Sequence, residues 1–210
     1  MRRELIVALT ALATIGAGAQ SGMAPWPVYP TGGAPPVLAP SIAAADLVII
    51  EVHAALLGEL HRKLEKGGPL LALGVCHAAA TSLARRVGSR EGVSVGLTSD
   101  RLRNPSNAPP AWAAPVIAEH AGRRAAAVEG FAIDLGDRVG VLRPIAEVEV
   151  CAACHGPAER MQPDVRSALE RRYPADRARG FRKGEIRGWF WVAVPKDGLA
   201  KRSPTPNPAR

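Results

Sequence analysis

The run Cys151-Ala152-Ala153-Cys154-His155 constrains this chain more than any other feature of its sequence. Two cysteines separated by two residues and followed directly by histidine form the attachment pattern of a c-type haem. This spacing lets both sulfurs reach neighbouring edges of one porphyrin, while the next residue lies under the metal. The same residues would also suit a disulfide redox pair, half of a zinc site or two structural thiols. We predict one covalent haem c on Cys151 and Cys154, with His155 as an iron ligand.

The first residues predict export from the cytoplasm. Arg2 and Arg3 form a basic start, residues 5–15 are apolar, and Ala17-Gly18-Ala19 is a small-residue cleavage pattern. The apolar stretch is shorter than the about 20 residues that span a bilayer, so residues 1–19 are interpreted as a signal peptide and not as a retained anchor. No later segment is expected to have the length of a membrane span. The mature protein is therefore predicted to be periplasmic, outside the cytoplasm, where haem of this kind is attached.

The chain has a formal net charge of +8, and its basic residues are concentrated after the haem motif. Export and the lack of interleaved aromatic residues argue against a nucleic-acid partner. Arginines in this region would suit haem propionates or an acidic redox partner, and a solvated basic surface is the alternative.

The remaining sequence predicts a single α+β domain. Residues 20–40 are rich in proline and glycine and are expected to form a tether, and residues 196–210 a loose tail. Between them, the domain at residues 41–195 should begin with two helices, 42–66 and 70–87, separated by Gly67-Gly68-Pro69. Shorter helices are expected between Pro109 and His120 and over 165–172. An antiparallel sheet should follow the long helices, with strands at 93–97, 124–133, 138–145 and 186–194.

The second axial position of the iron has several candidates. Met23 lies in the tether, and Met161 is too close to His155 in sequence to cross to the opposite haem face. The remaining candidates are Cys76, His77, His53, His61 and His120. On a helix, Cys76 and His77 point about 100° apart, so one conformation presents only one of them. The last three histidines are more typical of packing, surface or helix-capping residues, and Cys76 could also be a buried core thiol.

Four separated stretches of the sequence resemble a known family. They are Val75-Cys76-His77; Leu102-Arg103-Asn104-Pro105-Ser106-Asn107-Ala108-Pro109 with Trp112; Cys151-Ala152-Ala153-Cys154-His155-Gly156; and Tyr173-Pro174-Ala175-Asp176 with Gly180-Phe181, Gly184-Glu185 and Arg187-Gly188. In this order they are similar to the single-haem c-type family with a PAS-like sensor core, long catalogued as a domain of unknown function. The resemblance implies a PAS-like antiparallel sheet and a distal cysteine ligand, which corresponds to Cys76. His77 departs from the family pattern and is a second possible ligand.

The predicted chemistry agrees with that resemblance. A thiolate stabilises ferric iron and lowers the reduction potential. The loop residues Arg101 or Arg103 and the strand residue Arg187 would pair with propionates through bidentate contacts.

Three functions compete at this point. The first is a redox or gas-ligand sensor, in which reduction weakens the bond from Cys76 and a signalling partner responds. The second is a small periplasmic electron carrier that docks an acidic redox partner. The third, a haem enzyme, needs an open iron and a distal acid–base group, and the sequence offers only His77 for that role. A sensor or a carrier is therefore favoured over an enzyme.

Overall fold

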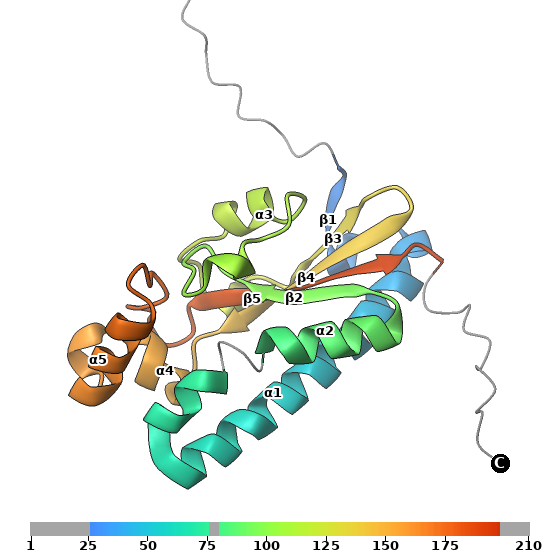
Figure 1. Ribbon diagram of the computed structural model, residues 1–210. Coiled ribbons are helices and arrows are strands. Elements are labelled where there is room, and N and C mark those ends of the chain that lie inside the picture. Colours follow the sequence, from blue (N-terminus) through green and yellow to red (C-terminus); the bar gives the residue numbers. More distant parts are fainter. Residues whose placement is uncertain (1–25, 76–79, 198–210) are drawn as a thin grey trace, which may run out of the picture.

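A computed structural model of the chain describes residues 26–75 and 80–197. Its centre is a five-stranded antiparallel sheet in the order β1-β3-β4-β5-β2 (Figure 1). The strands are β1 (Val28–Pro30), β2 (Ser94–Thr98), β3 (Phe131–Asp134), β4 (Arg138–Ala146) and β5 (Ile186–Pro195). The predicted α+β class with a long N-terminal helix and an antiparallel sheet is confirmed.

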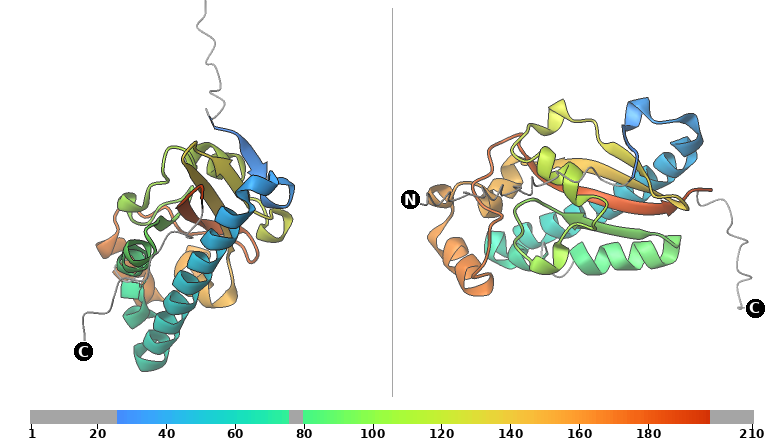
Figure 2. Two further views of the ribbon diagram at one scale, coloured as in Figure 1. Left: turned by 90° about the vertical axis from the view of Figure 1, so that its right-hand side faces the viewer. Right: turned by 90° about the horizontal axis from the view of Figure 1, so that it is seen from above.

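Helices cover both faces of this sheet. The long helix α1 (Ala39–Gly74) and helix α2 (Ala80–Glu91) pack on one face, and the short helix α3 (Ala114–Glu119) packs on the other (Figures 1 and 2). Strand β5 shows why: Phe190 and Val192 join the core under α1, while Trp189 joins the core under α3. Successive strand residues point to opposite faces, so an almost entirely apolar strand can supply two cores at once.

The glycine pair divides α1 into two helical segments. The sequence predicted a break at Gly67-Gly68-Pro69 and a second helix over 70–87. The structure confirms this break: Gly67 and Gly68 have non-helical backbone angles, and a second helical segment then runs to Gly74. Gly68 adopts φ of 64°, a left-handed conformation that glycine tolerates. Pro69 then lies at the start of the new helical turn, where its missing N–H is least costly.

The folded domain begins earlier than the sequence predicted. Val28–Pro30 pairs with β3, so part of the expected tether is an edge strand. Leu38 is only 1% exposed and belongs to the core under α1. The prolines and glycines of this segment were interpreted as flexible, but short 3-10 turns at Thr31–Gly33 and Pro36–Leu38 accommodate them. The proposed signal peptide lies outside the described residues.

One predicted strand is shorter than expected. Residues 124–133 were expected to be extended throughout, but Ala125–Ala127 forms a 3-10 turn and only Phe131–Asp134 pairs in the sheet. Gly130 separates the two with φ of 109°. Three consecutive alanines carry little strand preference, so the local turn prevails.

The length of α1 bears on the prediction that no later segment is long enough to span a membrane. Among the described residues, the stretch Pro36–Gly74 is long and apolar enough to cross a membrane by these two criteria alone. The expectation that no segment after the signal peptide reaches this length is therefore wrong. Ala45, Val48 and Val52 of this stretch are buried in the core, because α1 packs along the sheet.

Two further helices extend the domain beyond one end of the sheet. They are α4 (Glu149–His155) and α5 (Pro163–Arg172), and both contact the kinked end of α1 (Figure 1). Leu73 packs there with Met161, Val165, Leu169 and Tyr173. The haem motif therefore lies on a short helix, held between the sheet end and the second half of α1.

Candidate functional site

Helix α4 carries all three residues of the attachment motif. It begins directly after Val148 and ends at His155. Cys151 and Cys154 are three residues apart, which places them on one face of a helix, and both are half-buried. Gly156 stops the helix: a Cβ atom there would lie 2.7 Å from the carbonyl oxygen of Ala152. Only glycine lets the chain turn this closely behind the motif.

His155 is buried, and its two ring nitrogens have different surroundings. Nδ1 lies 2.9 Å from the carbonyl oxygen of Ala178. Because a carbonyl only accepts hydrogen bonds, Nδ1 must carry the proton and donate it. Nε2 then presents a lone pair, and this buried atom has no hydrogen-bond partner among the described residues. A buried lone pair without a donor is the arrangement that a metal ligand requires.

Burial also keeps the His155 ring neutral. Desolvation lowers the pKa of His155 well below its usual value, and the positive charges of Arg187 and Arg103 lower it further. Only the neutral imidazole binds a metal, so no proton has to leave before coordination at pH 7.

A buried ion pair fixes the loop that orients His155. Asp176 accepts from Arg103 Nε at 3.1 Å and from the Ala178 backbone N–H at 2.8 Å. The Arg103 Nη2 atom donates to the carbonyls of Cys154 and Ala178, at 2.5 and 3.2 Å. Arg103 and His155 therefore share one acceptor, the Ala178 carbonyl.

Two adjoining cavities open beside His155. The first, the apolar cavity, has a volume of about 490 Å³ and is lined by aliphatic residues of α1, by Cys151 and Cys154, and by Ile145 and Phe190 of the sheet. The second, the loop cavity, has a volume of about 330 Å³ and lies between α2, β2 and the loop 101–108. Both volumes fall in the range of cofactor and ligand sites. His155, Arg103 and Arg187 line both cavities, so the two cavities are neighbours.

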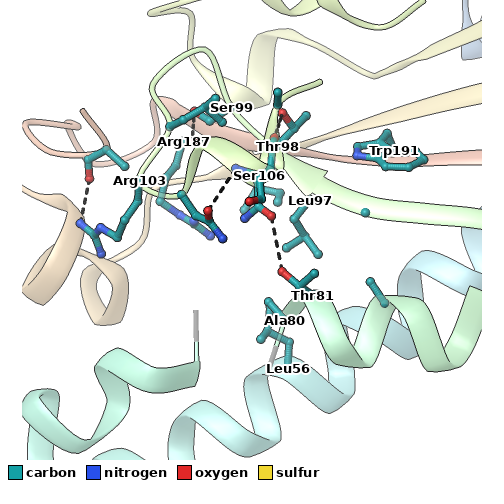
Figure 3. Close-up of a pocket in the computed structure, with 18 of the residues that line it drawn as sticks. Leu56, Ala80, Thr81, Leu97, Thr98, Ser99, Arg103, Ser106, Arg187 and Trp191 are labelled. Carbon is teal, nitrogen blue, oxygen red and sulfur yellow. Dashed lines mark hydrogen bonds between the residues drawn. The ribbon is translucent and has the colours of Figure 1, made fainter. Parts of the chain in front are cut away.

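The loop cavity is polar at one end. Figure 3 shows Arg103 and Arg187 at that end and Trp191 at the other, with Leu56, Ala80 and Thr81 on the helical side. Thr81 donates a hydrogen bond to the Asn107 side chain at 3.4 Å across this space.

The residues of the site fit a haem. The apolar cavity offers largely aliphatic surface to a porphyrin, Cys151 and Cys154 lie on its wall, and the Nε2 lone pair of His155 is available to a metal. Among the described residues, no three His, Cys, Asp or Glu side chains are grouped to hold a metal ion. A haem needs only axial ligands, because the porphyrin supplies the other four.

The three predicted arginines differ in their surroundings. Arg101 pairs with Glu185, and its guanidinium lies 3.5 Å above the centre of the Phe181 ring. Arg103 uses Nε and Nη2 inside the protein, so a propionate would have to bind its remaining nitrogen. The Arg187 side chain is 20% exposed, and its Nε lies 3.5 Å from Glu147. Arg187 is therefore the arginine best placed to bind a propionate, and this role stays a prediction.

The other candidate axial ligands lie in different parts of the protein. Cys76 and His77 lie outside the described residues. His53 lines the apolar cavity and packs on Phe190, with ring centres 5.3 Å apart, while His61 is exposed. His120 binds the Val116 carbonyl through Nδ1 at 2.9 Å, as a residue at a helix end does. Met161 is buried in the core beside α5.

Sequence reasoning missed two acidic residues of this site. Asp176 stood in a quoted motif without a role, and Glu147, four residues before Cys151, was not considered. Glu147 is 1% exposed although carboxylates are rarely buried. The only signal in the sequence was a carboxylate close to the haem motif, which does not reveal burial.

Comparisons with known proteins were made for the whole chain. A family model described as Tll0287-like matches residues 29–195. A solved structure, titled as the crystal structure of the cyanobacterial heme-protein Tll0287, superposes with a TM-score of 0.54 and 25% sequence identity. The match covers 71% of this chain and 91% of that chain. A comparison with curated proteins gave no match.

Proposed function

The chain belongs to the Tll0287-like family, and from this premise we propose that it is an exported c-type haem protein that senses redox state or a small gaseous ligand. The matched structure is that of a heme protein, and the haem is the part of the proposal with the most support. The observation that carries it is the buried Nε2 atom of His155, which has no hydrogen-bond partner among the described residues and belongs to a side chain that lines a largely apolar cavity.

Each residue of the site would have a defined task. Cys151 and Cys154 would bind the porphyrin edge as thioethers, and His155 would be the proximal ligand. Asp176 and Arg103 hold the loop whose Ala178 carbonyl accepts from His155, which fixes the ring orientation. When bound, the haem supplies a one-electron redox centre and an iron with one further axial position. Cys76 is proposed for that position, with His77 as the alternative.

Attachment is tested by expressing the full chain in a host that matures exported c-type haem. Haem that stays with the polypeptide after denaturation, seen by haem staining of a gel, is the expected result. A Cys151→Ser/Cys154→Ser variant should lose the stain, while Ser89→Ala, an exposed change on α2, should keep it. Colourless wild-type protein from such a host would contradict the proposal.

A sensing role is supported by the path of α1. This helix lines the apolar cavity through Leu57, Leu60 and Leu64, and its first half packs across the sheet. A change of ligation beside the cavity would therefore act on the helix that runs the length of the domain. Optical spectra across a redox titration, for wild type, Cys76→Ala and His77→Ala, test this. The same axial pair in both oxidation states would exclude a redox-driven ligand switch.

Electron transfer is the second candidate, and the surface around α5 favours it. Arg166, Arg171, Arg172 and Arg177 are exposed there, close to α4. A basic patch beside the cofactor would dock an acidic redox protein and give salt-sensitive electron exchange. Stopped-flow oxidation by an acidic one-electron acceptor at increasing salt, with no ligand change, would favour this role over sensing.

A further inference from the structure

Two neighbouring loops, one before β3 and one before β5, form an open basic pocket on the surface. Its lining residues are Gly122, Arg124, Gly180, Arg182, Lys183 and Glu185. The three cations among them are exposed. The function proposed above gives these cations no task, although they lie on a loop pair that the backbone holds in place.

Backbone contacts keep the cations of the two loops together. Arg124 and Glu185 form a β-bridge, and Ala125 N donates to Gly184 O at 2.9 Å. A Cβ atom at residue 184 would lie 2.7 Å from Arg124 Nη2. Glycine at this position, with φ of 81°, therefore lets the Arg124 guanidinium lie against the loop that carries the other two cations.

The carboxyl group among the lining residues is already bonded within the protein. Glu185 pairs with the Arg101 guanidinium and accepts from Arg182 N at 2.9 Å. Lys183 Nζ lies 3.9 Å from Glu149 Oε2, but these side chains are 82% and 87% exposed, and an ion pair in such a setting contributes little. The pocket therefore offers positive charge to an anionic partner.

The loop before β5 also contacts the proposed proximal ligand. Phe181 N donates to the His155 carbonyl at 3.1 Å, and Gly180 N donates to the Gly156 carbonyl at 2.9 Å. The centres of the Phe181 and His155 rings lie 6.4 Å apart. Arg182 follows Phe181 directly in the chain, so a protein bound at Arg182 would lie close to His155.

We propose that an acidic one-electron carrier protein docks at this pocket and exchanges an electron with the site. This inference rests on the proposed haem function. An open pocket with exposed cations suits the carboxylates of a protein surface better than it suits a small molecule, which an enclosed cavity would bury. An electron from the reduced partner converts ferric to ferrous iron, and no bond forms or breaks. On α5, by contrast, the exposed carboxylates Asp164 and Glu170 lie among the arginines.

The test compares two variants of the holoprotein that lose the same charge at different places. The pocket variant is Arg124→Gln/Arg182→Gln/Lys183→Gln. The α5 variant is Arg166→Gln/Arg171→Gln/Arg172→Gln. Binding of a fluorescein-labelled decaglutamate peptide is measured by fluorescence anisotropy at low salt. The pocket variant should bind the peptide about tenfold more weakly than wild type, and the α5 variant less than about threefold more weakly.

Electron exchange provides a second readout. Stopped-flow reduction of the ferric protein by a reduced plant-type ferredoxin, an acidic one-electron carrier, should be about tenfold slower for the pocket variant at low salt. The rates of all three proteins should converge at high salt, where the charges are screened. Arg182→Gln/Lys183→Gln, which leaves Arg124 against Gly184, should change both readouts in the same direction and replaces the pocket variant if that variant does not fold.

Two outcomes would overturn the assignment and leave haem binding intact. One is wild-type peptide binding and reduction in the pocket variant, and the other is a loss in the α5 variant that equals or exceeds the loss in the pocket variant. Protein without haem absorbance would instead refute the proposed function itself, whereas the peptide titration does not depend on haem.

Discussion

At the scale of single residues, the site depends on what lies behind His155 as much as on His155 itself. The Ala178 carbonyl determines which ring nitrogen carries the proton, and Asp176 and Arg103 determine where that carbonyl lies. Groups in this second layer are expected to tune a metal ligand through orientation and charge. The positive charge of Arg103 lies at the Ala178 carbonyl that accepts from His155. It weakens this carbonyl as an acceptor, so the imidazole becomes a weaker electron donor to a metal.

Replacing Arg103 should therefore affect both stability and redox properties. Arg103→Gln leaves the buried Asp176 carboxylate with Arg179 as its remaining cation, at 3.2 Å. We expect the free energy of unfolding to fall by about 3 kcal/mol, measured by urea denaturation. The haem midpoint potential should also fall, because a positive charge has left the surroundings of the ligand. Arg177→Gln, at an exposed position nearby, should change stability by less than about 1 kcal/mol.

The raised pKa of Glu147 predicts a pH dependence of folding stability. The folded state binds this proton more tightly than the unfolded state, whose pKa is 4.5. The stabilisation is complete below pH 4.5 and is lost as pH rises through about 7. Glu147→Gln should therefore be more stable than wild type at pH 8, by up to about 3 kcal/mol. His155, whose pKa is lowered, makes the stability of both proteins rise with pH. The difference in free energy of unfolding between the two proteins therefore reports Glu147 alone. An unchanged difference between pH 4 and 8 would contradict this prediction.

At the scale of elements, helix α1 contributes residues to two separate hydrophobic cores. Its first half buries Ala45, Val48 and Val52 against the sheet, and after the kink Leu73 packs against α5. Between these ends, leucines face the apolar cavity. The kink at Gly68 redirects the second half, which brings Leu73 to α5 while the first half stays on the sheet.

Substitutions on the buried and the exposed face of α1 should differ in their effect on folding stability. Val52 is 0% exposed and Ile50 is 63% exposed on the same helix. Val52→Ala should lower the free energy of unfolding by about 2 kcal/mol, since it removes buried methyl groups and leaves a small cavity. Ile50→Ala should change it by less than about 0.5 kcal/mol. Thermal unfolding of both variants followed by circular dichroism would measure the difference, and equal losses would contradict the packing.

At the scale of the whole molecule, one serine joins the start of α1 to the end of β5. Ser41, near the start of α1, donates to the carbonyls of Pro195 and Lys196, at 3.1 and 3.0 Å. Ser41 is 0% exposed, so its hydroxyl makes its hydrogen bonds within the protein and not with solvent. The start of the long helix is thereby fixed to the end of the last strand.

Removing this hydroxyl should loosen the closure of the domain. Ser41→Ala leaves two partly buried carbonyl groups without this donor, and we expect a loss of about 1 kcal/mol in the free energy of unfolding. Hydrogen exchange should increase at the end of β5 and the start of α1 together. Ser89→Ala, at an exposed position of α2, serves as the control and should show neither change.

Several parts of the fold could be predicted from the sequence because their signals are local. The apolar run of β5 and the alternation of β2 gave strands at their observed places, and the periodicity of α1 gave its first 25 residues or so. The Cys-x-x-Cys-His spacing is also a local signal, and the haem attachment that it indicates stays a prediction.

Local signals failed where distant partners decide the conformation. Val28–Pro30 is a strand because β3 lies beside it, and Ala125–Ala127 form a turn although a strand was predicted. Glycine and proline show only that the chain can bend, and the surroundings decide whether it does.

The sequence by itself determined the α+β pattern and contained the Cys-x-x-Cys-His spacing from which a c-type haem is predicted, since both depend on short-range spacing. Only the tertiary structure decided that His155 bonds to Ala178, that Arg103 pairs with Asp176, and that Glu147 is buried beside Arg187. These pairs join residues separated by 23, 73 and 40 positions in the chain. Burial and charge at such contacts arise from packing, and the residue types alone do not contain that information.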